Sequence, residues 1–170
     1  MSEKFFGKYR GIVVLNTDPE RRGRIQAQVP AVTGIALTSW ALPCFPSAGI
    51  QSGFFTVPPV GAGVWIEFEG GNIDAPIWSG CFYATGLEVP ALAVPAVPPA
   101  MGCFVLQTQN QTTLMVSDAP GPAGGVLLKT ALGAAISISD VGITITNGQG
   151  AIISLIGPTV SINGTALTIT

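Results

Sequence analysis

The sequence has no histidine among its 170 residues. Ser-His-Asp triads, Cys-His nucleophile pairs and most zinc sites need an imidazole, so this absence excludes them. Glu67 and Glu69 are the only close pair of carboxylates on an expected strand. Two carboxylates on one strand cannot flank a glycosidic bond from opposite sides, as an acid and a base must. The sequence therefore predicts a protein that is not an enzyme, with no catalytic residue, cofactor or metal.

Charged residues are scarce and unevenly placed. Only 9% of the residues are charged, 48% are hydrophobic, and the net charge is −2. The first 24 positions hold six of the seven basic residues, namely Lys4, Lys8, Arg10, Arg21, Arg22 and Arg24. Binding to nucleic acid requires a basic face that neutralises phosphates. The charge balance therefore argues against nucleic acid as a partner.

Long hydrophobic runs are also missing. No uninterrupted apolar stretch approaches the roughly 18 residues that a membrane-spanning helix needs, and 22 glycines and 14 prolines interrupt every candidate. The first residues lack the apolar centre of a signal peptide. We therefore interpret the surplus of apolar side chains as subunit interface.

Cysteine is the last scarce residue type. Cys44, Cys81 and Cys103 are odd in number and show no Cys-x-x-Cys spacing. This pattern favours buried thiols, in a protein made in a reducing cytoplasm, over a disulfide or metal framework.

The C-terminal stretch 134–170 is rich in alternating apolar and hydroxyl residues, and it has no charge after Asp140. A period of two residues predicts strands with one apolar and one hydroxyl-lined face. Turn sequences such as Asn163-Gly164 separate these strands. The apolar residues that we expect to form the core of this region are Ile136, Ile138, Ile143, Ile145, Ile153, Leu155, Val160 and Ile162.

The strands of this stretch are short, and each supplies only two or three inward apolar side chains. We expect them to be too short to close a hairpin sheet of their own. A repeat that cannot bury its own face must stack on further copies. The sequence therefore predicts an oligomeric β-helix in which several identical chains wind together.

The N-terminal half predicts a small barrel. Residues 5–15 and 24–29 are expected to form a hairpin with a basic tip, and residues 61–72 and 74–83 a second pair of strands. Five strands in about 80 residues, with bends at glycine, are typical of a Greek-key barrel of the OB type. Arg21, Arg22 and Arg24 at the basic tip are either a solvated turn or a contact surface.

Several stretches of this half resemble the OB domain of contractile-tail spike proteins. The family includes phage baseplate assembly protein V, the phage baseplate spike and the VgrG proteins of type VI secretion. The resemblance covers roughly residues 8–83, and the 134–170 repeat is similar to the triple-stranded β-helix of the family. The matching stretches are Gly11–Val14, Asp18-Pro19, Gly23–Pro30, Pro59–Gly71 and Pro76–Gly80.

Together with composition, the resemblance implies an all-β fold in four parts. An OB-fold barrel (1–83) is followed by a Pro-rich linker (84–100), neck strands (101–133) and an intertwined trimeric β-helix, or β-prism, spike (134–170). Proline-rich linkers favour extended, polyproline-like chain. We expect the eight apolar core residues to meet on the axis of the trimer.

The resemblance also implies a function and partners. We expect a structural central spike of a contractile phage tail or tail-like injection baseplate, which joins the hub and tube to the membrane-piercing tip. Arg21, Arg22 and Arg24 are candidates for contact with a baseplate hub protein, and Leu167, Ile169 and Thr170 for contact with a PAAR-like tip protein. The homotrimer would be assembled in the bacterial cytoplasm and located in a virion tail baseplate or tail-like particle. It would meet a membrane only by piercing the target cell.

An alternative interpretation is an OB-type module on a trimeric fibre that binds glycan or nucleic acid. Such modules stack their ligands on aromatic side chains. The acidic balance of the chain lacks the electrostatic part of nucleic-acid binding. The candidates for an aromatic platform are Trp40, Phe54, Phe55, Trp65 and Trp78.

Overall fold

The computed structural model describes residues 3–93, 102–164 and 166–169. The chain is all-β with very little helix and forms two compact units, residues 1–88 and 89–170. The helical segments are α1 (Pro30–Thr33) and the short 3-10 turns η1 (Glu69–Gly71), η2 (Gly86–Glu88) and η4 (Gly121–Ala123). Within the described ranges, no helix is long and apolar enough to cross a bilayer.

The N-terminal unit is built on a five-stranded sheet with the order β2-β1-β6-β7-β3. Its strands are β1 (Tyr9–Leu15), β2 (Gln26–Gln28), β3 (Leu42–Pro43), β6 (Gly63–Phe68) and β7 (Pro76–Phe82). β3 runs parallel to β7, and the other pairs are antiparallel. The predicted pairing of the two flanks of the basic tip is confirmed as β1–β2, and the second predicted pair is confirmed as β6–β7.

The hydrophobic core of this unit follows from alternation along its strands. In β1 the side chain of Val13 is buried, whereas those of its neighbours Ile12 and Val14 are exposed. The indole N–H of the buried Trp78 donates a hydrogen bond to the carbonyl oxygen of Gly23 (3.1 Å), which ties β7 to the segment before β2. The core comprises Val13, Ile25, Ala27, Val29, Ala41, Val64, Ile66, Phe68 and Trp78.

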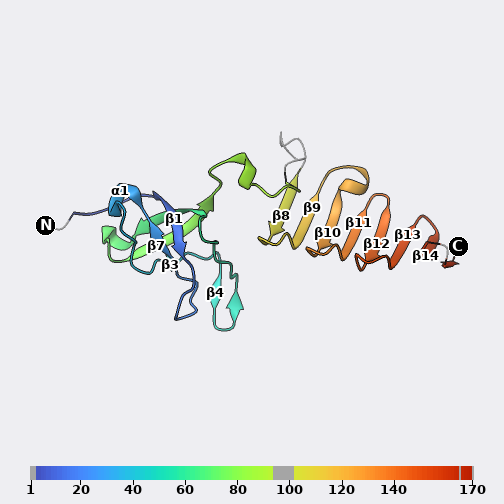
Figure 1. Ribbon diagram of the computed structural model, residues 1–170, viewed down its shortest axis with the longest axis horizontal. Coiled ribbons are helices and arrows are strands. Elements are labelled where there is room, and N and C mark those ends of the chain that lie inside the picture. Colours follow the sequence, from blue (N-terminus) through green and yellow to red (C-terminus); the bar gives the residue numbers. More distant parts are fainter. Residues whose placement is uncertain (1–2, 94–101, 165, 170) are drawn as a thin grey trace. The chain divides into compact units, whose positions relative to one another are not determined.

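A separate two-stranded hairpin, β4 (Ala48–Gly49) with β5 (Ser52–Gly53), extends away from the five-stranded sheet (Figure 1). We call this hairpin, with its tip residues Ile50 and Gln51, the arm. Gly53 has a φ of 140°, and a Cβ atom there would lie 2.6 Å from the carbonyl oxygen of Ser47. Only glycine fits this position, which fixes the return of the arm to the barrel sheet.

The C-terminal unit is a single eight-stranded sheet in which each strand pairs with the next (Figure 1). All seven pairs are antiparallel. The strands are β8 (Cys103–Gln107), β9 (Thr113–Ser117), β10 (Gly125–Lys129), β11 (Ala135–Ser139), β12 (Gly142–Thr146), β13 (Ile152–Ile156), β14 (Thr159–Ile162) and β15 (Leu167–Ile169).

The expectation that these strands are too short to pair with one another is wrong. Short connections reverse the chain after each strand, from residues 140–141 between β11 and β12 to residues 118–124 between β9 and β10. After β14, Asn163 and Gly164 both have positive φ (48° and 68°). Positive φ at consecutive residues matches the twist of a hairpin. Each inner strand has a neighbour on both sides, so stacking compensates for the short length of each strand.

Parts of the predicted division of the chain stay predictions. The sheet continues without a break from β8–β10 into β11–β15. The separate role of residues 101–133 as a neck therefore stays a prediction. Of the predicted Pro-rich linker, residues 94–100 lie outside the described residues.

Candidate functional site

The main candidate for a functional surface is one face of the C-terminal sheet. Residues directly opposite each other on paired strands point to the same face, and here apolar residues face apolar residues across every pair. Each strand contributes two of them, which form two parallel columns. One column is Phe104, Val116, Val126, Ile138, Ile143, Leu155, Val160 and Ile169, and the other is Leu106, Leu114, Leu128, Ile136, Ile145, Ile153, Ile162 and Leu167.

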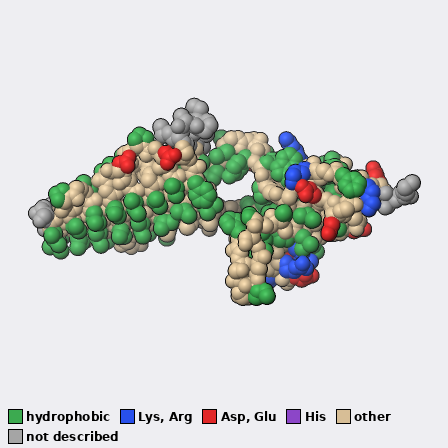
Figure 2. Space-filling view, turned by 180° about the vertical axis from the view of Figure 1, so that it is seen from behind, with side chains coloured by type: hydrophobic (Ala, Val, Ile, Leu, Met, Phe, Trp, Pro, Cys, Tyr) green, Lys and Arg blue, Asp and Glu red, His purple; other side chains and the backbone are tan. Residues whose placement is uncertain are grey.

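These two columns, the apolar face, are uncovered. Figure 2 shows them as rows of hydrophobic side chains along the unit. Most of the column residues are between 36% and 59% exposed, among them Ile136 at 41% and Ile145 at 44%. In the C-terminal unit, Met115 on the opposite face is the one buried apolar side chain among the described residues. The chain alone therefore does not bury the face that carries most of its C-terminal apolar residues.

The structure brings all eight predicted core residues together on the apolar face. Leu167 and Ile169, predicted to contact a tip protein, continue the same two columns on β15. Among the described strands, β15 is also an edge of the sheet, with a partner on one side only. Thr170, the third predicted tip residue, lies outside the described residues.

The opposite face of the sheet is lined by hydroxyls over β11–β14. Ser137 faces Thr144, which faces Ser154, which faces Ser161. The Ser154 and Ser161 hydroxyl oxygens lie 2.7 Å apart in a hydrogen bond. Apart from Ala135 and the exposed Ile152 and Ile156, this hydroxyl face carries polar but uncharged groups. It is therefore better suited to water than the apolar face.

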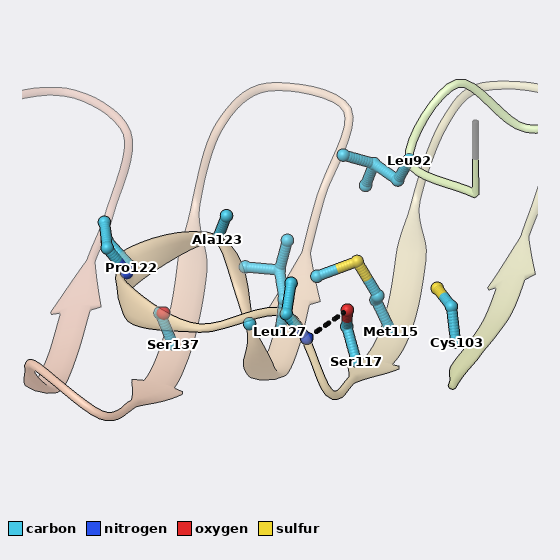
Figure 3. Close-up of a pocket in the computed structure, with 10 residues that line it drawn as sticks. Leu92, Cys103, Met115, Ser117, Pro122, Ala123, Leu127 and Ser137 are labelled. Atoms are coloured by element: carbon cyan, nitrogen blue, oxygen red, sulfur yellow. Dashed lines mark hydrogen bonds between the residues drawn. The ribbon is translucent and has the colours of Figure 1, made fainter. Parts of the chain in front are cut away.

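Near β8–β10 the hydroxyl face gives way to a small apolar cavity of about 310 Å³. Figure 3 shows Leu92 and Met115 near one another at the cavity, with Cys103 on β8 beside Met115. The Ser117 hydroxyl accepts the N–H of Ala119 (3.3 Å) and holds the turn that leads to η4. The polar groups here are engaged in turn structure, and the cavity carries no constellation for catalysis.

The basic tip of the N-terminal unit is organised around Asp18. Its carboxylate accepts hydrogen bonds from the backbone N–H groups of Glu20 (3.0 Å), Arg22 (2.7 Å) and Arg24 (3.3 Å). It also accepts from the guanidinium of Arg24, at 3.0 Å from Nε and 2.7 Å from Nη2. The side chains of Asp18 and Arg24 are only 3% and 13% exposed.

This arrangement shifts both ionisation equilibria. The hydrogen bond from Arg24, assisted by the three backbone N–H groups, holds the pKa of Asp18 far below its usual range despite the desolvation of the carboxylate. The same hydrogen bond raises the pKa of Arg24 above its ordinary value. The guanidinium also lies over the ring of Trp40, 5.4 Å from its centroid. The Asp18–Arg24 pair is therefore a fixed part of the turn.

The three predicted hub-contact residues consequently differ in their surroundings. Arg24 faces inward to Asp18, with a further ion pair to Glu20 (3.0 Å). Arg22 is exposed and pairs with Glu20 (3.1 Å). Arg21 is exposed at the tip with a positive φ of 55°. Arg21 and Arg22 are thus the members of the set whose charges face solvent.

The five residues of the predicted aromatic platform do not form one surface. Trp78 is buried in the core, and Trp65 packs against Phe82 with ring centroids 5.0 Å apart. Phe54 and Phe55 are exposed beside the arm. An OB-type module that stacks a ligand on these five side chains is therefore not favoured.

Glu67, one of the two carboxylates considered in the sequence analysis, is engaged in an ion pair. Glu67 pairs with Lys8, which lowers the pKa of the carboxyl, and Lys8 also donates to the Ser79 hydroxyl (2.7 Å). In the described part of the chain, no cluster of three or more cysteine and acidic side chains could hold a metal ion.

The expectation of buried thiols is wrong. Cys44 and Cys81 are exposed, and Cys103 is half-buried. Cys44 follows the two-residue strand β3, and Cys81 lies at an outward position near the end of β7. Their place in the fold, after a strand for Cys44 and on the outward face of a strand for Cys81, decides their exposure rather than residue type.

Two features were missed by sequence reasoning. The role of Asp18 had a signal, because Asp followed by Pro and a glycine-closed turn is typical of a carboxylate that caps its own backbone. The arm had none, because its serine, alanine and glycine residues show no alternation of apolar and polar side chains.

Two parts of the chain match known families. Residues 9–83 match the family described as the type VI secretion system/phage-baseplate injector OB domain. Residues 103–168 match the family described as the phage baseplate V C-terminal trimerisation domain. No curated protein matches the chain. The two matches occur in the order that the sequence analysis predicted, and the first confirms the OB-type barrel.

Proposed function

Because this chain belongs to the contractile-tail baseplate spike family, we propose that three copies form the central spike of a phage tail or tail-like injection baseplate. Both matched families are structural parts of baseplates and injectors, which favours a structural role over an enzymatic one. In this proposal the spike joins the hub and tube to the tip that pierces the target membrane. The trimer is assembled in the bacterial cytoplasm.

The observation that carries the proposal is the uncovered apolar face within the matched trimerisation domain. Eight strands about 4.8 Å apart and five residues wide give a face of roughly 34 by 17 Å, or roughly 600 Å². A face of this size is at the upper end of what a monomeric protein leaves exposed. Self-association is the direct way to cover it.

We propose that each chain supplies one side of a three-sided prism. The apolar columns of the three sheets meet on the axis, and the hydroxyl faces point outward to water. In this arrangement the backbone hydrogen bonds of each sheet stay within one chain, and the three chains adhere through side-chain packing. Intertwined strands, as expected from the sequence, are not required for it.

A matched pair of substitutions tests the trimer. Ile145→Asp places a charge on the apolar face of β12, whereas Thr144→Asp places the same charge on the hydroxyl face one residue away. An unpaired buried charge costs several kcal/mol, and three copies would face each other on the axis. Analytical ultracentrifugation at micromolar concentration should show a trimer for the unsubstituted chain and for Thr144→Asp, but a monomer for Ile145→Asp.

Two results would contradict this proposal. A monomeric unsubstituted chain would remove the trimer itself. An Ile145→Asp variant that sediments as a stable trimer would show that the apolar face is not the interface.

The two ends of the spike have separate proposed partners. At the barrel, the exposed Arg21 and Arg22 are the candidates for steering a hub protein into place, with Arg24 holding the turn through Asp18. At the other end, the open edge of β15 with Leu167 and Ile169 is suited to a PAAR-like tip protein, which would pair with the edge and cover the last apolar layer.

A further inference from the structure

The arm is an exposed projection without charge. The sequence has no charged residue from Ile25 to Ile66, which includes the whole arm. Ile50 at the tip is 98% exposed, and Phe55, just after the arm, is 67% exposed. One fully exposed apolar side chain at the tip of the arm and exposed phenylalanines at its base together indicate an interaction surface.

The arm is also held in a defined position. Phe45 before it packs edge-on against the buried Trp78, with ring centroids 5.5 Å apart, and against Phe55 at 5.6 Å. The N–H of Phe54 donates to the carbonyl oxygen of Ser47 (2.9 Å), which closes the base of the hairpin. A pre-organised projection loses little conformational entropy on docking.

A second apolar surface, with Ile12 and Val14 exposed and Trp65 and Phe82 half-buried, lies on the outer face of the barrel sheet. We call it the β1 patch, and it consists of Ile12, Val14, Trp65 and Phe82. Ile12 pairs with Gly63, and Gly63 pairs with Phe82, so the row crosses three strands on one face. Arg10 lies over the rings of Trp65 (5.5 Å) and Phe82 (5.3 Å), so the charge nearest the patch is already paired with aromatic rings.

The arm and the β1 patch together meet the requirement of a threefold ring for two different surfaces on each copy. A contact between neighbours in a ring of three is heterologous, so each copy must present two different surfaces that complement each other. A projecting apolar arm and a flat apolar patch are such a pair. The trimerisation domain would hold the barrels near each other, at an effective concentration on the order of millimolar, and a weak contact then suffices.

We propose that the arm of each barrel packs on the β1 patch of the next barrel, which closes a ring of three barrels. This inference rests on the proposed trimer. Ile50 contacts Ile12 and Val14 of the neighbouring copy, and the uncharged arm adds no charge to a patch in which Arg10 already lies over Trp65 and Phe82. The ring gives the barrels a fixed arrangement that the C-terminal sheets alone do not supply.

Disulfide trapping in the full-length chain tests the ring. In a background with Cys44→Ser, Cys81→Ser and Cys103→Ser, Ile50→Cys is combined with Val14→Cys, and in a second variant with Ile12→Cys. In a heterologous ring both cysteines of every copy are used, so mild oxidation should give a covalent trimer on a non-reducing denaturing gel. The matched control joins Ile35→Cys, at a position as exposed as Ile50 but outside the arm, with Val14→Cys and should stay monomeric on the gel.

Sedimentation of the same samples before oxidation separates the possible failures. A native trimer that yields the covalent trimer from either arm variant, and not from the control, supports the ring. If the native protein is a trimer but both arm variants stay monomeric on the gel, or cross-link no more than the control, the proposed ring is overturned. The proposed trimer is not affected by that result. If sedimentation shows a monomer, both the proposed trimer and the proposed ring are overturned. Shielding of Ile50→Cys from maleimide only after a hub protein is added would identify the hub as the partner and also overturn the ring.

Discussion

At the scale of single residues, Asp18 has the most defined role in the N-terminal unit. One carboxylate satisfies three backbone N–H groups and the guanidinium of Arg24, and so fixes the turn between β1 and β2. Sequence reasoning named Arg24 as a candidate for an external partner, with a solvated turn as the alternative, because the sequence showed its charge and not its contacts. The charges that remain available to a partner are those of Arg21 and Arg22.

The lowered pKa of Asp18 predicts an acid-sensitive turn. A group whose pKa is depressed in the folded state stabilises the protein above its unfolded pKa of about 3.9, and this contribution is lost as the pH falls through the native pKa. Asp18→Asn keeps the size of the side chain but removes the charge and one acceptor. We expect a lower melting temperature at pH 7 and a smaller further loss between about pH 5 and pH 2 than in the unsubstituted protein.

Thermal unfolding followed by circular dichroism across that pH range measures both effects. Glu20→Gln is the matched control, because the Glu20 side chain is exposed to solvent, which screens its ion pairs with Arg22 and Arg24. Equal melting temperatures and equal pH profiles for Asp18→Asn and the unsubstituted protein would refute the assigned role.

At the scale of the strand, the sequence predicted alternation but not pairing. The period of two residues placed Ile143 and Ile145 on one face and Thr144 on the other, as observed. Alternation is a local property of one strand. Whether a strand pairs with a strand of the same chain or of another chain depends on turn geometry and on burial, which no single strand encodes. The β1–β2 and β6–β7 hairpins were predictable because their turns and alternation agree.

The edge strand β15 gives a prediction about the tip. Deletion of residues 167–170 removes one strand of eight and leaves seven apolar layers on the same face. We expect the trimer to persist and a co-expressed tip protein to be lost from it, because the edge and the last apolar layer form its proposed contact. Affinity purification of the spike followed by mass spectrometry measures whether the trimer persists and whether the tip protein is still bound.

A control for this deletion is Ile156→Ser, which changes an exposed apolar residue on the opposite face of β13. This variant should retain the tip protein. Retention of the tip protein by the deletion variant, or loss of its trimer, would contradict the proposed contact.

At the scale of the whole chain, the two units differ in how they bury apolar groups. All nine residues of the hydrophobic core cluster belong to residues 1–88, whereas the C-terminal sheet leaves its apolar columns uncovered. We therefore expect residues 1–88 alone to give a soluble monomer that unfolds cooperatively. The full chain should be a trimer, because association depends on the sheet.

Calorimetry and sedimentation of the shortened and full-length chains check this difference. A shortened chain that forms trimers as tightly as the full chain would contradict the assignment of the interface to the C-terminal sheet. Substituting Ile66→Ala in the shortened chain is a useful comparison, because Ile66 is fully buried. Its unfolding free energy should fall by about 2–5 kcal/mol if the core is intact on its own.

The uninterrupted pairing of β8 to β15 also has a mechanical consequence. In an antiparallel sheet the hydrogen bonds lie perpendicular to the strands, so here they point along the direction in which the strands are stacked. A thrust along that direction presses every rung of the stack against the next at the same time. A pull at Ile169 concentrates the load on the outermost hydrogen bonds between β15 and β14, so that pair separates first and the next pair follows. This sheet therefore resists compression along the stack better than it resists a pull at its end.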